Sequence, residues 1–222
     1  MIFLYKLKKN KWSVFFISIV LLFTIFVYFQ QPDNIKFKNE YEKNSDIYGE
    51  LIIPEENPMK YINVKEAVSL LQSGTGIIYI GFPECPYCRQ VVPFLIQAAE
   101  RANVEEIYYL NITKYNNEFK VENGEVKKAK KEKAGYYELL EELKDITKEL
   151  WITEGSFRYL VEEKRIASPT VLKVQNGEWE EFDMMTITEI KQNEEKTEEE
   201  KQEEIIQKIV DFFQKHLQYL EK

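Results

Sequence analysis

Cys85 and Cys88 are the only cysteines in the chain, and only Pro86 and Tyr87 separate them. A zinc site needs about four ligands, and the single histidine, His216, lies far away in the sequence, so no metal site is predicted. A purely structural disulfide is also a poor interpretation, because closing so short a loop removes little chain entropy. The remaining interpretation is a pair of thiols that exchanges with disulfides of other molecules.

The residues around the pair predict a buried strand followed by a helix. Residues 77–80 read Ile-Ile-Tyr-Ile, a run typical of a strand covered on both faces. Apolar residues at helical spacing then continue from Cys85 to about residue 102. Cys85 would stand at the helix amino terminus, where unpaired N–H groups and the helix dipole stabilise a thiolate. Pro86 suits the first turn. Cys88, one turn later, would be better shielded, so Cys85 is the predicted nucleophile and Cys88 the resolving thiol.

The chain after residue 58 alternates between helical and extended patterns. Asn176-Gly177 between two strand-like runs is a strong hairpin signal, and an apolar stripe near the carboxyl end predicts a closing helix. The expected helices cover residues 64–71, 85–102, 136–152, 157–163 and 205–217, and the expected strands cover 77–80, 107–112, 170–174 and 178–182. This order predicts an α/β fold with a central mixed sheet flanked by helices.

At three places these residues resemble the thioredoxin superfamily. They are the Cys-Pro-Tyr-Cys motif after a buried strand, Pro93 eight residues after the first cysteine, and Ser-Pro-Thr at 168–170 before a hairpin. The resemblance implies a thioredoxin-like fold, a cis peptide bond before Pro169, and a redox-active disulfide with no other cofactor. Besides Cys85 and Cys88, the substrate-binding residues that it implies are Ser168, Pro169, Pro86 and Tyr87. The nearest match is the membrane-anchored type, including the bacteriocin-transport accessory proteins of Gram-positive bacteria.

Some features depart from the family pattern. Glu84 stands where thioredoxins commonly have tryptophan, and its negative charge should oppose formation of the Cys85 thiolate. Together with Pro93, at the position where the family kinks its helix, Glu84 is expected to modulate the site. Tyr79 occupies the position of a buried acid that assists proton transfer in thioredoxins. The segment before the implied cis-proline is long, which predicts a helical insertion over about residues 114–160.

An uncharged apolar run over residues 12–29 is long enough, at about 27 Å as a helix, to cross a bilayer as one transmembrane helix. Trp12 and Tyr28 lie at its ends, where amphipathic rings favour the headgroup layer. Four lysines within residues 1–11 predict a cytoplasmic basic end and an extracytoplasmic remainder. A cleaved signal peptide is the rival interpretation, although no small-x-small cleavage site follows the run.

Beyond the apolar run, residues 30–57 are polar and are predicted to be a tether, and residues 58–222 the folded domain. The net charge of −8 becomes −12 when the four amino-terminal lysines are removed. Such an acidic remainder repels phosphate backbones, which argues against a nucleic-acid partner.

With the resemblance, these features predict a single-pass membrane protein whose extracytoplasmic domain is a thiol–disulfide oxidoreductase acting on exported proteins or peptides. Oxidase, reductase and isomerase share the motif, so the direction of the reaction stays open. An outward-facing reductase would need a redox partner in the membrane. The alternative is a non-catalytic thioredoxin-like accessory or scaffold protein of a membrane or secretion system.

Overall fold

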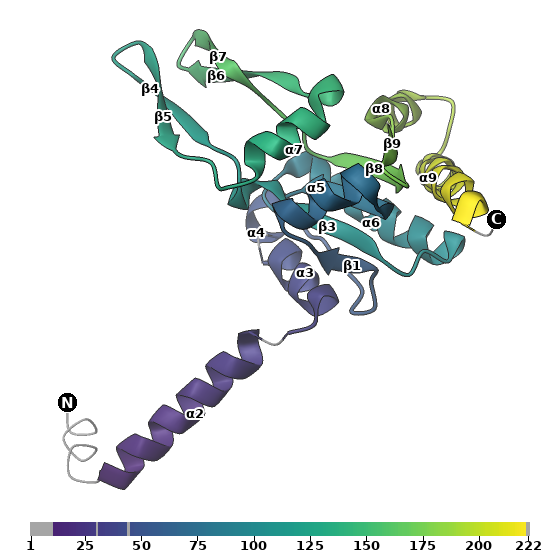
Figure 1. The fold of residues 1–222 in the computed structure, drawn as a ribbon. Helices are drawn as coiled ribbons and strands as arrows, with labels where there is room; N and C mark the ends of the chain where they lie inside the picture. The colour runs from purple at the N-terminus through teal and green to yellow at the C-terminus, as the bar shows by residue number, and fades with distance from the viewer. Residues whose placement is uncertain (1–10, 30, 44, 221–222) are drawn as a thin grey trace.

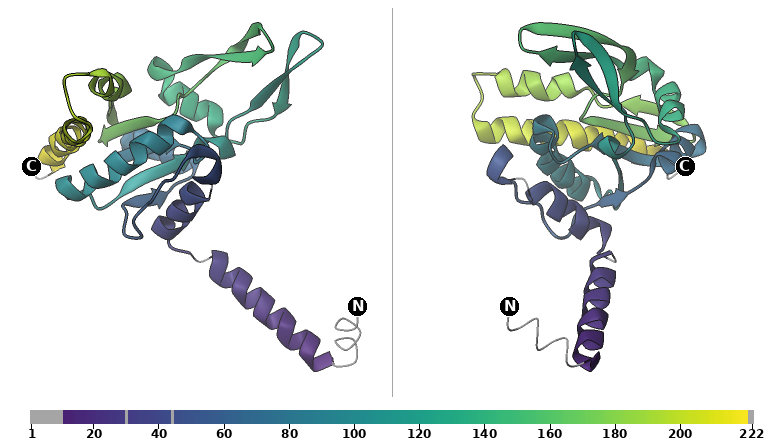
Figure 2. Two further views of the ribbon diagram at one scale, coloured as in Figure 1. Left: turned by 180° about the vertical axis from the view of Figure 1, so that it is seen from behind. Right: turned by 90° about the vertical axis from the view of Figure 1, so that its left-hand side faces the viewer.

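A computed structural model of the protein describes residues 11–29, 31–43 and 45–220 (Figures 1 and 2). Its centre is a five-stranded mixed sheet with the strand order β1-β3-β2-β8-β9. The first three strands of this order run parallel, and β8 and β9 are antiparallel to their neighbours. The strands are β1 (Met59–Tyr61), β2 (Thr75–Gly81), β3 (Ile107–Asn111), β8 (Thr170–Gln175) and β9 (Glu178–Glu181). The predicted α/β class with a central mixed sheet is therefore confirmed.

Helices cover both faces of the sheet because the central strand is apolar on both sides. In β2, Ile77 and Tyr79 pack into one buried cluster, and Ile78 and Ile80 pack into the other, as the two-residue period of a strand requires. Four helices contribute to the first cluster: α3 (Asp33–Glu42), α6 (Pro86–Ala102), α8 (Met184–Gln192) and α9 (Glu198–Leu220). Two helices contribute to the second: α5 (Val64–Ser73) and α7 (Tyr136–Glu142).

The insertion between β3 and β8 is mostly extended, so the predicted helical insertion over residues 114–160 is wrong in its secondary structure. It contains two hairpins that contact each other and extend together from the sheet (Figure 1). Its elements are η1 (Ile112–Lys114), β4 (Glu118–Glu122), β5 (Glu125–Lys130), α7, η2 (Lys144–Ile146), β6 (Lys148–Glu154) and β7 (Phe157–Arg165). The helix expected over 136–152 ends at Glu142, and the helix expected over 157–163 is a strand.

The reason for this difference lies in turn geometry and in strand pairing. Asn123 and Gly124 both have positive φ, of 56° and 79°, which matches the twist of a tight hairpin. In the second hairpin, Leu150 pairs with Val161 and Ile152 with Tyr159. These apolar residues therefore alternate along β6 instead of following the helical spacing of the residues before them.

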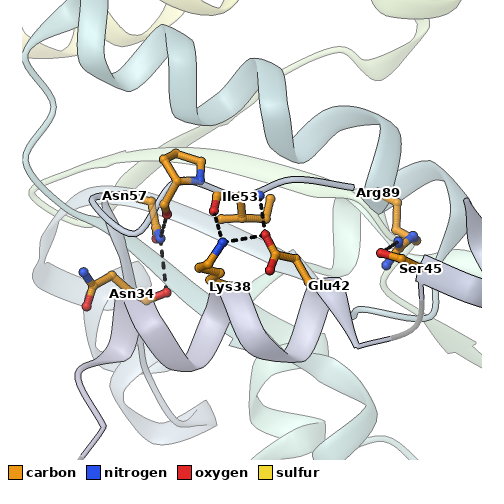
Figure 3. Close-up of polar contacts among 8 residues, drawn as sticks. Asn34, Lys38, Glu42, Ser45, Ile53, Asn57 and Arg89 are labelled. Atoms are coloured by element: carbon orange, nitrogen blue, oxygen red, sulfur yellow. Dashed lines mark hydrogen bonds and ion pairs between the residues drawn. The ribbon is translucent and has the colours of Figure 1, made fainter. Parts of the chain in front are cut away.

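The segment predicted as a polar tether, residues 30–57, differs from that expectation because part of it packs into the core. Phe37 and Tyr41, one helical turn apart on α3, are both fully buried, and so is Ile53. Lys38 bonds both the Glu42 carboxylate and the Ile53 carbonyl at 2.7 Å, and Glu42 accepts the Ile53 N–H at 2.8 Å (Figure 3). A short helix, α4 (Ser45–Tyr48), follows.

At the amino-terminal end, α2 (Lys11–Phe29) extends away from the sheet in both figures. Its apolar side chains from Trp12 to Phe23 are largely exposed. Among the residues whose side chains the structure describes, no helix is long and apolar enough to cross a membrane. The basic end predicted over residues 1–11 lies outside the described residues except for the backbone of Lys11, and the spanning helix over 12–29 stays a prediction.

Candidate active site

Cys85 lies at the junction that the sequence predicted, between the end of β2 and the start of α6. It is the N-cap residue of α6, and its sulfur accepts the backbone N–H of Cys88 at 3.3 Å. Pro86 occupies the first helical position, where no intrahelical N–H bond is lost. The helix thus directs its unpaired N–H groups at the Cys85 sulfur, as expected for a stabilised thiolate.

The two thiols have opposite tendencies to ionise. The side chain of Cys88 hydrogen-bonds to Cys85 and, with the backbone N–H groups of Cys88 and Tyr87, lowers the pKa of Cys85 to about 7 against the opposing effect of burial. Burial, followed by the interaction with Cys85, raises the pKa of Cys88 far above its ordinary value. Both cysteines are reduced. Cys85 is therefore about half ionised near neutral pH, whereas Cys88 is kept as a thiol.

Cys85 is less accessible than a simple exposed nucleophile, because its side chain is only 5 % exposed and Cys88 is fully buried. The loop before β8 covers Cys85, whose thiol donates to the Ser168 carbonyl at 3.5 Å. The peptide bond between Ser168 and Pro169 is cis, as the family resemblance implied. Because Thr170 pairs with Ile80 at the end of β2, the sheet itself holds this loop next to the cysteines.

The other predicted site residues lie around Cys85 and Cys88, either on the surface or further along α6. Tyr87 is 69 % exposed, and Pro86 and Glu84 are exposed beside it on the surface around the motif. Pro93 lies inside α6, about two turns beyond Cys85. The structure therefore brings Ser168 and Pro169 to the cysteines, leaves Tyr87 at the rim, and puts Pro93 further along the helix.

A tyrosine pair behind Cys88 is the main feature of the site that the sequence did not predict. Tyr79 is fully buried, its hydroxyl lies 2.9 Å from that of Tyr41, and burial, followed by the neighbouring Cys88, raises its pKa. Gly81 leaves room for these groups, because a Cβ there would lie 2.5 Å from the Tyr79 hydroxyl oxygen and 3.0 Å from the Cys88 sulfur. Burial raises the pKa of both tyrosines well above 10, so both are protonated donors at physiological pH.

Arg89, the residue after Cys88, connects this site to the amino-terminal segment. Its guanidinium is buried and donates to the backbone carbonyl of Tyr41 and to the Gly49 carbonyl at 2.9 Å. A further bond reaches the Ser45 hydroxyl at 3.4 Å (Figure 3). The guanidinium also reaches the Pro83 carbonyl of the active-site loop at 3.5 Å. These uncharged oxygens belong to the amino-terminal segment and to the active-site loop, so Arg89 holds the two segments together.

Of the sequence signals for these extra residues, only one was specific. Tyr79 stood where the family that the sequence resembles has a buried acid, whereas Tyr41 could have been found only from its one-turn spacing with Phe37 in a polar segment. In comparisons with known proteins, no family model, no curated protein and no solved structure matches the chain. Within the described ranges, no cluster of three or more His, Cys, Asp or Glu side chains is arranged to hold a metal ion.

Proposed function

We propose that the chain is a thiol–disulfide oxidoreductase of the thioredoxin-like type. One observation carries the proposal: Cys85 caps the start of α6 with its pKa lowered to about 7, and the thiol of Cys88 lies in contact with it. A thiol attacks a disulfide only as its thiolate, and a pKa near the ambient pH is best for this attack. A buried pair of cysteines without an exchange function would need no such acidity.

The reaction proceeds by two exchanges. The Cys85 thiolate attacks one sulfur of a partner disulfide, a Cys85–partner disulfide forms, and the other partner sulfur leaves with the electron pair and takes up a proton. Cys88 then attacks the Cys85 sulfur, which forms the Cys85–Cys88 disulfide and releases the second partner thiol with the proton that Cys88 loses. The partner is reduced by two electrons and the cysteine pair is oxidised; the reverse sequence oxidises a partner dithiol.

The proposed substrates are exported proteins or peptides. Three features near Cys85 support this class: the exposed ring of Tyr87, the neighbouring Pro86, and the loop of Ser168 and Pro169. In this loop, the Ser168 carbonyl accepts a hydrogen bond from the Cys85 thiol. An extended peptide along this loop would bring its own sulfur to Cys85 and place an apolar side chain against Tyr87. Ser168, Pro169, Pro86 and Tyr87 are therefore the proposed substrate contacts.

We also propose that residues 12–29 anchor the chain in a membrane with the domain outside the cytoplasm. The support is the uncharged apolar sequence, the lysines before it and the exposed apolar side chains of α2. Two experiments test this proposal. Sodium carbonate extraction of isolated membranes tests the anchor, and protease treatment of intact cells from which the wall has been removed tests the orientation. A chain released by carbonate, or protected from the protease, would contradict it.

The redox proposal is tested by measuring the reduction potential of the full chain in detergent, equilibrated with defined thiol buffers. A potential near about −270 mV would indicate a reductase, and one near about −120 mV a disulfide donor. The Cys85→Ser and Cys88→Ser variants are matched controls that cannot close the disulfide. If the native pair forms no reversible disulfide, the redox proposal is wrong and the scaffold alternative replaces it.

A further inference from the structure

Two tyrosine hydroxyls lie in contact with each other, and one of them lies close to the Cys88 sulfur. A Cβ on Gly81 would lie 2.5 Å from the Tyr79 hydroxyl oxygen and 3.0 Å from the Cys88 sulfur, so both groups border the same small space, and the Tyr41 hydroxyl lies 2.9 Å from that of Tyr79. When Tyr79 donates its proton to sulfur, its own oxygen is left to accept the proton of Tyr41. The two hydroxyls then donate in series, and donors in series strengthen one another in a low-dielectric interior.

Packing alone does not explain these hydroxyls. Both rings are fully buried within a large apolar cluster, where phenylalanine would fill the same space without the cost of removing a hydroxyl from water. The chain also has Gly81 at a position where a Cβ would crowd both the Tyr79 oxygen and the Cys88 sulfur. The arrangement therefore keeps a hydrogen-bond donor close to the resolving thiol.

The resolving thiol needs such help because its surroundings oppose ionisation. Cys88 is fully buried, and a buried thiol resists becoming a thiolate, the form that attacks a disulfide. The titratable groups next to the Cys88–Tyr79 pair are Cys85 on α6, Tyr41 on α3 and Tyr109 on β3. Of these, Cys85 is bonded to the partner at the moment of resolution and carries no charge.

We propose that Tyr79, oriented by Tyr41, donates the hydrogen bond that stabilises the developing Cys88 thiolate while Cys88 resolves the mixed disulfide. Tyr79 is thus a catalytic residue and Tyr41 a positioning residue. This inference rests on the proposed thiol–disulfide exchange. In the step concerned, the Cys88–Cys85 bond forms, the Cys85–partner bond breaks, and the electron pair leaves with the partner sulfur. The proton lost by Cys88 goes to that leaving thiolate, and Tyr79 keeps its own proton.

The inference gives the amino-terminal segment a part in the chemistry. Tyr41 belongs to α3. Arg89, the residue directly after Cys88, donates from its guanidinium to the Tyr41 backbone carbonyl. Arg89 therefore fixes the backbone of Tyr41 relative to the same helix that carries the resolving thiol. Loss of this contact would let the Tyr41 hydroxyl move away from Tyr79.

The test follows the reaction of the reduced full chain with one equivalent of an aromatic disulfide that releases a coloured thione at each exchange. The first release reports attack by Cys85, and the second reports resolution by Cys88. A hydrogen bond to a charged group changes such a step by roughly tenfold or more. We expect Tyr79→Phe to slow the second release about tenfold and to shift its pH profile upward by about one unit, while the first release keeps its rate.

Tyr41→Phe should slow the second release by about threefold, and the Tyr79→Phe/Tyr41→Phe double variant should match Tyr79→Phe alone, because Tyr41 acts through Tyr79. Tyr136→Phe is the matched control, since Tyr136 is equally buried but belongs to the cluster on the other face of the sheet. It should leave both releases and their pH profiles unchanged even if it lowers the thermal stability.

The outcomes separate the two proposals. Absence of the first release in the native chain would reject the exchange function itself. A normal first release, with a second release that Tyr79→Phe leaves unchanged in rate and pH profile, would overturn the role of Tyr79. If Tyr79→Phe does not fold, Tyr41→Phe decides, because it retains the Tyr79 hydroxyl, and an unchanged second release in that variant would equally overturn the inference.

Discussion

Replacement of Cys88 by alanine would remove the side chain that contributes most to the low pKa of Cys85. The backbone N–H of residue 88, 3.3 Å from the Cys85 sulfur, and that of Tyr87 would remain. The variant therefore separates the effect of the neighbouring thiol from the effect of the helix start. It also leaves Cys85 as the one thiol of the chain, so alkylation reports a single site.

The magnitude follows from the two ionisation limits. With a pKa of about 7, roughly half of Cys85 is thiolate at pH 7, whereas an ordinary thiol of pKa about 8.5 is about 3 % ionised there. Loss of every stabilising contact would thus lower the thiolate fraction by roughly fifteenfold. Because the two N–H donors remain in Cys88→Ala, we expect a smaller loss of about fivefold, with the pKa of Cys85 raised by about one unit.

The assay is the rate of iodoacetamide alkylation of Cys85, followed by mass spectrometry from about pH 5 to about pH 9. The native chain should show a midpoint near 7, and the variant a midpoint about one unit higher. Cys88→Ser is the control that restores a side-chain hydroxyl donor, and it should lie between the two. A native midpoint at the ordinary value, or no shift in Cys88→Ala, would refute the argument.

Three further predictions follow from burial and charge. Gly81→Ala should destabilise the protein by about 1–3 kcal/mol through overpacking against Tyr79 and Cys88, measured by urea unfolding, and a variant as stable as the native chain would contradict the close contact. Phe37→Ala should lower the free energy of unfolding by about 3–5 kcal/mol, whereas Phe157→Ala on the exposed end of β7 should change it by less than about 0.5 kcal/mol. In the reduced protein, the lowered pKa of Cys85 should make the free energy of unfolding rise with pH between about 7 and the ordinary thiol value of about 8.5. The reason is that Cys85 binds more protons in the unfolded chain than in the folded one within that window. Urea midpoints measured across it should show the rise in the native chain and not in Cys85→Ala.

Local signals in the sequence were sufficient for the centre of the fold and for the cysteines. The run around Tyr79 is apolar at every position, which is typical of a strand buried on both faces, and the prolines and cysteines that follow it fit a helix start. The Asn176-Gly177 turn likewise predicted the β8–β9 hairpin, which the structure confirms. In these segments, each local preference agrees with the tertiary structure.

Elements that depend on distant contacts were missed. In α3, Phe37 and Tyr41 are separated by charged and polar residues, and only the sheet that they pack against makes their spacing meaningful. In β6, Leu150 and Ile152 continued the apparent helical spacing that begins at Leu139. They form a strand because β6 pairs with β7. The contact between Tyr41 and Tyr79 joins residues 38 positions apart, and no local pattern contains it.

The docking of α3 against the sheet also sets a working distance. If residues 12–29 lie in a membrane as proposed, only residues 30–32 separate α2 from α3, and three extended residues reach about 10 Å. A free tether over residues 30–57 would have reached up to about 95 Å. If the proposed exchange function also holds, Cys85 would stay within about one domain's breadth of the lipid headgroups. Its substrates would then be proteins still emerging from the bilayer or attached to it before those that diffuse far from the cell surface.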